Sequence, residues 1–259
     1  MPEPVIRAEG VVFNLDGSKP VATRINHGQQ LTPSAIPKFY PLNGQQLEAL
    51  LTWIRADNGL LEVGLSKCFI PRHGFIFYNA NDEVIGSVSV CFECEAFRRN
   101  PQKNSPSAPK RPTAKSIKKA MKRLEDLKQL TKSIGLPVLE NPDQNSRQPQ
   151  FMTVNGRLQA KIDDGSESLN ACMQSTVAVS SKVTVVWSGE RINVSLGNNR
   201  QLSDSENNCL KTKIRELSAT VYQHASLSMQ TIVTVKRTSP SNSETLTNPT
   251  SRPLTPTGP

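Results

Sequence analysis

Residues 75–90 of the chain read FIFYNANDEVIGSVSV. Two runs rich in β-branched and aromatic side chains, 75–78 and 84–90, flank a loop of turn-forming residues at 79–82. This pattern predicts an antiparallel β-hairpin. If Tyr78 pairs with Glu83, strand alternation gives the hairpin one core-facing set of side chains: Phe75, Phe77, Val84, Val88 and Val90.

Three cysteines and a histidine surround this hairpin. Alternation places His73 and Cys94 on the core-facing side and Cys68 and Cys91 on the other side, and a bulge at Pro71 would shift Cys68 by one place. In either register Cys68 lies near the Cys91-x-x-Cys94 pair. A disulfide from Cys68 to Cys91 or Cys94 is therefore the favoured interpretation.

Three other interpretations of this cluster stay open. The cysteines can be reduced and buried as small apolar side chains. Three thiolates and His73 can hold a zinc ion, although such sites favour a C-x-x-C in a tight turn, and Phe92-Glu93 is expected to continue the strand. The last interpretation is a thiol-redox site, but no helix start closely follows Cys94 to lower a thiolate pKa.

Upstream of the hairpin, the sequence predicts a strand over residues 4–14, an irregular polar stretch over 18–43 and a helix that starts at Asn43. Asn43 and Gln46 have the spacing of a capping box. Apolar side chains then recur at helical spacing and predict a stripe that covers a sheet. These side chains are Leu47, Leu50, Leu51 and Ile54.

The net charge of +9 is concentrated in one segment. Residues 98–132 hold 12 basic and two acidic side chains, a net charge of +10, so the rest of the chain sums to −1. Residues 98–115 are rich in proline and predict a flexible linker, whereas 116–134 predict a basic amphipathic helix that docks on the N-terminal domain. The alternative is that this helix binds an anionic partner, nucleic acid or a membrane surface. The basic residues on which that alternative depends are Lys118, Lys119, Lys122 and Arg123.

Residues 44–139 resemble an uncharacterised family of bacterial proteins. The likeness lies in Cys68-Phe-Ile-Pro-Arg-His-Gly-Phe-Ile-Phe-Tyr78, in Val90-Cys-Phe-Glu-Cys94 and in a helix that ends with Ile134-Gly-Leu-Pro137. The long basic insert between Phe97 and Ser116 departs from the family pattern. The resemblance implies no assigned activity.

The C-terminal half predicts the order helix, hairpin, helix, strand. Ser203 and Glu206 have the spacing of a capping box for the second helix, and Asp164 is expected to cap the first. Alternating apolar side chains predict the strands, which together with the helices make an α+β sandwich. Their core-facing positions are Val183, Val185, Trp187, Ile192, Val194, Leu196, Leu227, Met229, Thr231, Val233 and Val235.

Cys172 and Cys209 fall on the sheet-facing stripes of these two helices. Neighbouring helices can bring them within disulfide range, so the sequence predicts a bridge, with two unbridged core cysteines as the alternative. A bridge that closes this loop stabilises a small domain by roughly 3–4 kcal/mol in the chain-entropy description.

The order of elements over residues 163–235 resembles the C-terminal domain of TonB and related periplasmic modules. Some relatives carry a cysteine in each helix, as in Leu169-Asn-Ala-Cys172 and Asn208-Cys209 here. The resemblance implies an envelope adaptor or binding module without catalysis or a cofactor. One departure is that no proline accompanies the aromatic Tyr222 where the second helix closes.

The composition suits modules joined by irregular segments, with 36% hydrophobic and 5% aromatic residues, 14 Gly and 19 Pro in 259 residues. No apolar run approaches the roughly 18 residues of a membrane helix, and no signal peptide is visible in the first residues. P-loop, dinucleotide-binding and zinc-protease motifs are absent. His27, His73 and His224 have no evident partner for a catalytic triad.

The chain is therefore expected to be an α+β protein of two small domains, each a short antiparallel sheet covered by helices, joined by Pro-rich and basic linkers. The expected divisions are a domain over 1–141, a linker over 142–162, a domain over 163–236 and a disordered tail over 237–259. The expected function is a non-enzymatic interaction or adaptor module that binds a protein partner in the bacterial periplasm. The alternatives are a cytosolic protein that binds an anionic partner and a thiol-redox or zinc-binding protein. No cofactor is expected except zinc in that last case.

Overall fold

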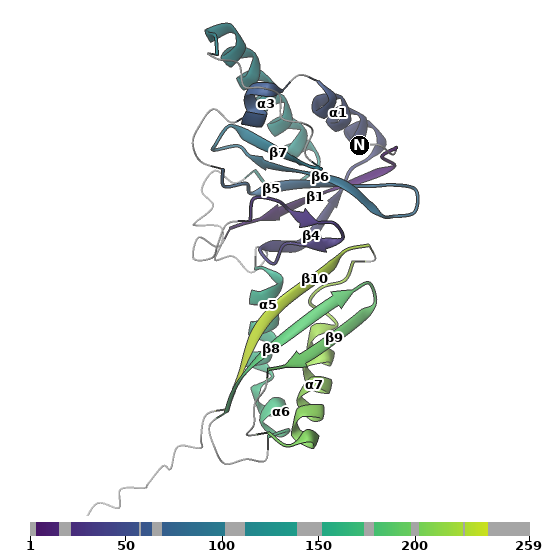
Figure 1. Cartoon of the computed structure of the whole chain (residues 1–259), viewed down its shortest axis with the longest axis vertical. Coiled ribbons are helices and arrows are strands. Elements are labelled where there is room, and N and C mark those ends of the chain that lie inside the picture. Colours follow the sequence, from purple (N-terminus) through teal and green to yellow (C-terminus); the bar gives the residue numbers. More distant parts are fainter. Residues whose placement is uncertain are drawn as a thin grey trace, which may run out of the picture.

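A computed structural model describes residues 4–15, 22–56, 58–63, 69–101, 112–138, 152–173, 179–197, 202–224 and 226–237. These residues form two five-stranded sheets, in which all strand pairs but one are antiparallel, together with helices (Figure 1). The predicted mixed α+β class is confirmed.

The first sheet, called sheet A, has the strand order β4-β1-β5-β6-β7. Its strands are β1 (Arg7–Phe13), β4 (Ala35–Pro41), β5 (His73–Tyr78), β6 (Val84–Cys91) and β7 (Ala96–Asn100). One face of sheet A packs against α1 (Gly44–Arg55), α2 (Gly59–Val63) and α3 (Ala114–Ser133). β7 uses three residues of the stretch that was expected to be a linker, because Arg98, Arg99 and Asn100 pair with β6.

The β5–β6 hairpin is present, but its register differs from the prediction. Phe75 pairs with Val88, and Tyr78 pairs with Val84 rather than with Glu83. Phe75, Phe77, Val88 and Val90 face the helices as predicted, because a shift of two residues preserves the alternation. The placement of Val84 is wrong: a bulge at Ile85 turns Val84 toward the opposite face.

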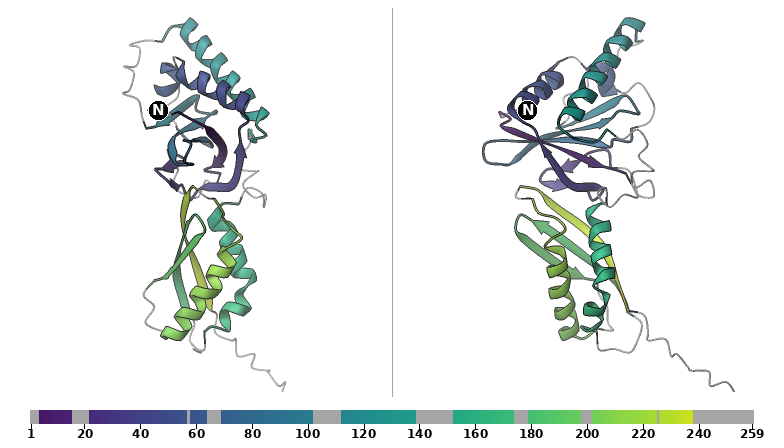
Figure 2. Two further views of the ribbon diagram at one scale, coloured as in Figure 1. Left: turned by 90° about the vertical axis from the view of Figure 1, so that its right-hand side faces the viewer. Right: turned by 180° about the vertical axis from the view of Figure 1, so that it is seen from behind.

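α1 and α3 begin and pack largely as their sequences predict. Asn43 and Gln46 form both hydrogen bonds of the capping box. α3 begins slightly earlier than expected, with Thr113 as its N-cap, and the chain leaves it through Gly135 at a φ of 79°. The two helices lie side by side over sheet A (Figure 2). The indole N–H of Trp53 donates to the Arg123 carbonyl (2.6 Å).

The second sheet, called sheet B, has the strand order β2-β3-β10-β8-β9. Its strands are β2 (Asn26–His27), β3 (Gln30–Leu31), β8 (Val179–Ser188), β9 (Arg191–Leu196) and β10 (Ser228–Arg237). The helices beside it are α5 (Val154–Asp164), α6 (Ser166–Asn170) and α7 (Asp204–Ser218). The predicted capping box of Ser203 and Glu206 starts α7, and the predicted core positions of β8 and β10 are buried.

Two expectations about this half are wrong. α5 occupies most of the described part of the predicted linker, starts at the N-cap Thr153 and buries Val154, Leu158 and Ile162. Asp164 ends α5 instead of capping the next helix, and α6 follows Gly165 without a side-chain cap. The sequence signal of α5 is weak, because its buried residues fall only at every fourth position and its first turn has no acidic residue.

A connecting segment, Ala22–Leu31, joins the two sheets although residues 18–43 were expected to be irregular. At the start of this segment, the Asn14 side-chain amide donates to the Ala22 carbonyl (2.6 Å). At its end, the segment forms β2 and β3 of sheet B. Ile25 packs so closely on β5 that a Cβ at Gly74 would lie 2.8 Å from the Ile25 Cβ. The segment therefore sits directly on sheet A.

One cluster of buried apolar side chains continues from sheet A into sheet B. It includes Val11, Phe13 and Ile76 on the second face of sheet A, together with Trp187 and Val233 in sheet B. The two sheets therefore share an uninterrupted core, with α1 and α3 toward one end of the molecule and α6 and α7 toward the other (Figure 1).

Candidate functional site

The Cys91-x-x-Cys94 motif forms a tight turn between β6 and β7. Residues 92–95 are turn residues and Glu95 has a φ of 52°, so the expectation that Phe92-Glu93 continues the strand is wrong. The Cys94 N–H donates to the Cys91 Sγ (3.1 Å), and the Ile70 N–H donates to the Cys94 Sγ (3.4 Å). The two sulfur atoms lie at disulfide distance from each other.

This turn changes the faces that the cysteines occupy. Cys91 and Cys94 pack together in a small buried cluster with Ala96, on the side of Phe69 and Ile70. Cys94 therefore does not share the core face with His73, because the turn interrupts the strand alternation on which that prediction depended. Cys68 lies outside the described residues, and so does its predicted disulfide.

His73 is buried on the helix side of sheet A. Its Nε2–H donates to the Pro137 carbonyl (2.9 Å), and its ring lies 5.0 Å from the ring of Phe92. Burial lowers the pKa of His73 to about 4, the charge of Arg72 adds to that effect, and the hydrogen bond to Pro137 opposes it. The ring is therefore neutral near pH 7.

Nδ1 of His73 is buried and meets no hydrogen-bond partner among the described residues. Within that same part of the chain, no three His, Cys, Asp or Glu side chains are arranged to hold a metal ion. The proposed zinc ligands Cys68, His73, Cys91 and Cys94 are thus brought together only in part: Cys91 and Cys94 are adjacent, and Nε2 of His73 is bonded elsewhere.

Cys172 and Cys209 lie 2.05 Å apart between their sulfur atoms, so this predicted disulfide pair is present. Their surroundings differ from the prediction. Cys172 is buried in the turn after α6 rather than within a helix, and Cys209 is exposed on α7 rather than on its buried stripe. The bridge therefore joins the interior to the surface.

The basic residues of α3 divide into two groups. Lys118, Lys119 and Lys122 are exposed, as binding of an anionic partner requires. Arg123 turns inward instead, and its guanidinium donates to the Trp53 carbonyl (2.8 Å) and to the Asn58 side chain. Arg123 therefore attaches α3 to α1.

A polar network that the sequence did not predict lies where the two sheets meet. The carboxylate of Glu9 accepts from the Tyr78 hydroxyl (2.7 Å) and from Nε2–H of His224 (2.8 Å). His224 Nδ1 accepts from the backbone N–H groups of Ser226 and Leu227, which fixes the proton on Nε2.

Burial raises the pKa of Glu9, but the hydrogen bonds from His224 and Tyr78, together with the charge of Arg7, outweigh burial and hold this pKa below its usual value. The hydrogen-bonded residues of this network are up to 215 positions apart in the chain, so no local sequence pattern predicts it. The network therefore holds β1, β5 and the stretch after α7 together.

The outer edge of β10 is the second feature that the sequence missed. β3 pairs with β10 only at Ser228, so the edge beyond that residue has no strand partner among the described residues. Instead, the Gln159 side-chain amide of α5 donates to the Thr234 carbonyl (3.0 Å) and accepts from the Thr234 N–H (3.1 Å). Asn155 donates to the Ile232 carbonyl (2.9 Å) in the same way.

A groove of about 370 Å³ lies where this edge meets α5 and α6. Its floor is apolar, from Ile162, Leu169 and Val235, and its rim carries Asp163 and Lys236. The side chain of Ile232, on the outer face of the same strand, is 52% exposed. A pocket beside a strand edge that lacks a strand partner can accept alternate side chains of an extended peptide.

No model of a known protein family, no curated protein and no solved structure matches the chain. The described helices include none that is long and apolar enough to cross a bilayer.

Proposed function

We propose that the chain is a non-catalytic protein-interaction module of the bacterial envelope, and that it binds an extended segment of a partner protein along the edge of β10. The observation that carries this proposal is the Gln159 amide on Thr234. It makes both hydrogen bonds that the peptide group of a neighbouring strand would make.

The geometry of β10 supports strand addition. Met229, Thr231, Val233 and Val235 point into the core, whereas Gln230, Ile232 and Lys236 point outward. The backbone groups of Ile232 and Thr234 that point away from β8 reach only side-chain amides. A partner strand replaces flexible side chains with a continuous hydrogen-bond ladder, and the groove accepts its alternate side chains.

The proposed periplasmic location of the protein is inferred from its cysteines. Two cysteine pairs lie at disulfide distance, and disulfides persist mainly in oxidising compartments such as the periplasm. The resemblance of residues 163–235 to periplasmic TonB-like modules agrees with this proposal.

The test begins with extended peptides selected from a random display library against the full chain, with affinities measured by fluorescence anisotropy. N-methylation of successive peptide amides should abolish binding at every second position, because only alternate N–H groups face a neighbouring strand. Uniform sensitivity, or none, contradicts strand addition.

Two variants are expected to change the affinity for the peptide in opposite directions. Gln159→Ala frees the edge of β10 and should strengthen peptide binding severalfold, whereas Gln129→Ala, on exposed α3, should leave it unchanged. Thr234→Pro removes the N–H that faces the partner, is tolerated at a strand edge and should weaken binding about tenfold or more. Weaker binding in Gln159→Ala would show that Gln159 contacts the peptide directly and that the edge is not the site.

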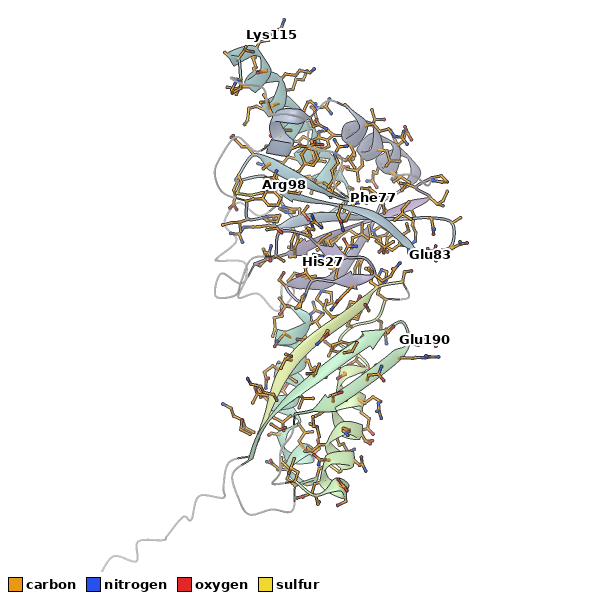
Figure 3. The ribbon with its side chains drawn as sticks, in the orientation of Figure 1. His27, Phe77, Glu83, Arg98, Lys115 and Glu190 are labelled. Carbon is orange, nitrogen blue, oxygen red and sulfur yellow. A yellow bond between two sulfur atoms is a disulfide. The ribbon has the colours of Figure 1, made fainter. Side chains whose placement is uncertain are left out.

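A second candidate function rests on α3. Its N-terminal end extends beyond sheet A, with Lys115 at the tip (Figure 3), and Ile117 and Met121 are 37% and 38% exposed beside Lys118, Lys119 and Lys122. Apolar side chains within a basic helix suit an anionic surface. Cosedimentation with phosphatidylglycerol vesicles tests this function. A K118Q/K119Q/K122Q variant should lose the binding, and unchanged binding would reject this candidate.

A further inference from the structure

An arginine-lined pocket of about 290 Å³ lies at one end of sheet A, away from the β10 edge. Three stretches that are distant in sequence form it: Thr23 and Arg24 of the connecting segment, Phe69 before β5, and Arg98 and Arg99 of β7. Figure 3 labels Arg98 on β7. The cluster is invisible in the sequence, because only two of its arginines are adjacent.

Arg98 and Arg99 are held in place by contacts within the fold. Nη1 of Arg98 donates to the Glu62 carbonyl, and its guanidinium lies 4.7 Å from the centre of the Phe69 ring. Arg99 pairs with the Glu62 carboxylate through Nη2 and lies 5.3 Å from the Phe97 ring centre. Two guanidinium groups are therefore positioned before any ligand arrives, which lowers the entropy lost on binding.

These contacts leave hydrogen-bond capacity unused. Nε of Arg99 is buried and meets no acceptor in the described part of the chain. Arg24 is half-buried and has neither an acidic partner nor a hydrogen-bond acceptor among the described residues. Buried guanidinium donors without acceptors are unfavourable, so an anion that reached Nε of Arg99 would stabilise the pocket.

The charge of the pocket is also unbalanced. Counting only the residues that the structure describes, three arginines face one carboxylate, that of Glu62, which leaves a net charge of +2. A phosphate monoester carries about −1.5 to −2 charge near pH 7 and three acceptor oxygens. Arginine recognises such oxygens in a bidentate manner, and the Thr23 hydroxyl adds a further donor.

We propose that this pocket binds a phosphate monoester carried on a small organic group. Its volume exceeds that of a bare phosphate ion, and Phe69 provides an apolar wall for the group that bears the phosphate. Arg24 closes on the phosphate from the connecting segment, while Arg98 and Arg99 hold it from β7. The site is independent of the β10 edge and of the lysines of α3.

The test uses isothermal titration of the full chain with phenyl phosphate, AMP, inorganic phosphate and benzoate. Phenyl phosphate and AMP should bind more tightly than inorganic phosphate, because the organic group adds contact, and benzoate should bind most weakly because it carries a single charge. The relative affinities of phenyl phosphate and AMP distinguish an aryl phosphate from a nucleotide as the ligand.

Arg24→Gln is the decisive variant, because Arg24 makes no hydrogen bond or ion pair with the described residues. It should weaken phenyl phosphate binding about tenfold or more without a change in Tm. Arg191→Gln removes one charge from an exposed position on β9 and should change the affinity less than about twofold. Thr23→Val, a second variant outside the internal contacts, should weaken binding by a smaller factor.

Equal weakening by Arg24→Gln and Arg191→Gln would reduce the effect to overall charge and overturn the proposal. Absence of heat for phenyl phosphate up to about 10 mM would overturn it as well, since that concentration corresponds to less than about 3 kcal/mol of binding free energy.

Discussion

Cys172 and Cys209 lie 37 residues apart in the sequence and Cys91 and Cys94 only three apart, yet each pair brings its sulfur atoms to disulfide distance. In the chain-entropy description, the longer loop corresponds to about 4 kcal/mol of stabilisation and the shorter one to about 2 kcal/mol. The first pair joins the turn after α6 to α7, whereas the second closes a turn that the Cys94 N–H already braces.

This difference separates two uses of cysteine in one chain. The pair beside sheet B restrains a loop that no other covalent link restrains. The pair in sheet A restrains little that the β6–β7 ladder does not already hold, so its value lies in local geometry or in redox chemistry rather than in global stability. The following predictions test this contrast or the surroundings of the shorter pair.

The largest effect is expected from removal of the longer bridge. Cys172→Ser with Cys209→Ser should lower the free energy of unfolding by about 4 kcal/mol, and Cys91→Ser with Cys94→Ser by about 2 kcal/mol or less. Urea unfolding followed by circular dichroism measures both. Equal losses in the two double variants would abolish the contrast.

The neighbourhood of the short pair should also make the fold sensitive to acid through His73. Its folded-state pKa of about 4 lies below the unfolded value of 6.5, so the unfolded chain binds the proton first as pH falls. Stability contributed by the neutral ring is complete above pH 6.5 and is lost down to pH 4. The loss is about 3 kcal/mol, from 1.36 kcal/mol per pKa unit.

His73→Gln keeps an N–H for the Pro137 carbonyl and does not titrate. The difference in unfolding free energy between pH 7 and pH 4.5 should therefore shrink in this variant, as measured by urea titration. The exposed His27→Gln serves as the control and should retain the wild-type pH dependence. An unchanged pH dependence in His73→Gln would remove His73 as the cause.

Gly74 tests how tightly the connecting segment packs near the same end of sheet A. Gly74→Ala places a methyl group against Ile25 and should lower the unfolding free energy by about 1–3 kcal/mol. Gly44→Ala, where no atom lies within 4 Å of the added Cβ, should be neutral or stabilising. Thermal unfolding of the pair measures this difference, and a neutral Gly74→Ala would show that Ile25 moves freely.

The smallest change to measure is one of mass. Tryptic digestion without reductant places Cys91 and Cys94 in one peptide, 73–98, and Cys68 in another, 68–72. If Cys91 and Cys94 pair, peptide 73–98 runs about 2 Da below its reduced mass. A cross-link between the two peptides would instead establish the bridge from Cys68.

Much of the fold could be predicted because its signals are local. The capping boxes at Asn43 and Ser203 and the alternation of β8 and β10 depend on residues a few positions apart, and the structure confirms them. Val84 was misplaced because one extra residue in β6 reverses the alternation beyond it. The turn after Cys91 was not predicted because Phe92-Glu93 contains no glycine, the residue that usually indicates such a turn.

The candidate sites were less predictable, since they depend on residues brought together only by the fold. Gln159 meets Thr234 across 75 residues, and Arg24 meets Arg98 and Arg99 across more than 70. Sequence patterns of helices and strands relate only nearby residues, so these contacts could be found only from the folded structure.

The two short strands on one side of sheet B, β2 and β3, come from the connecting segment near the start of the chain. A gene fragment that begins at residue 152 would encode the three long strands of that sheet but would leave the start of β10 and the side of the shared core uncovered. Expressed alone, that fragment would expose both surfaces to solvent, and these surfaces would promote its self-association. The unit that can be exchanged, fused or transplanted is therefore the whole chain rather than either half.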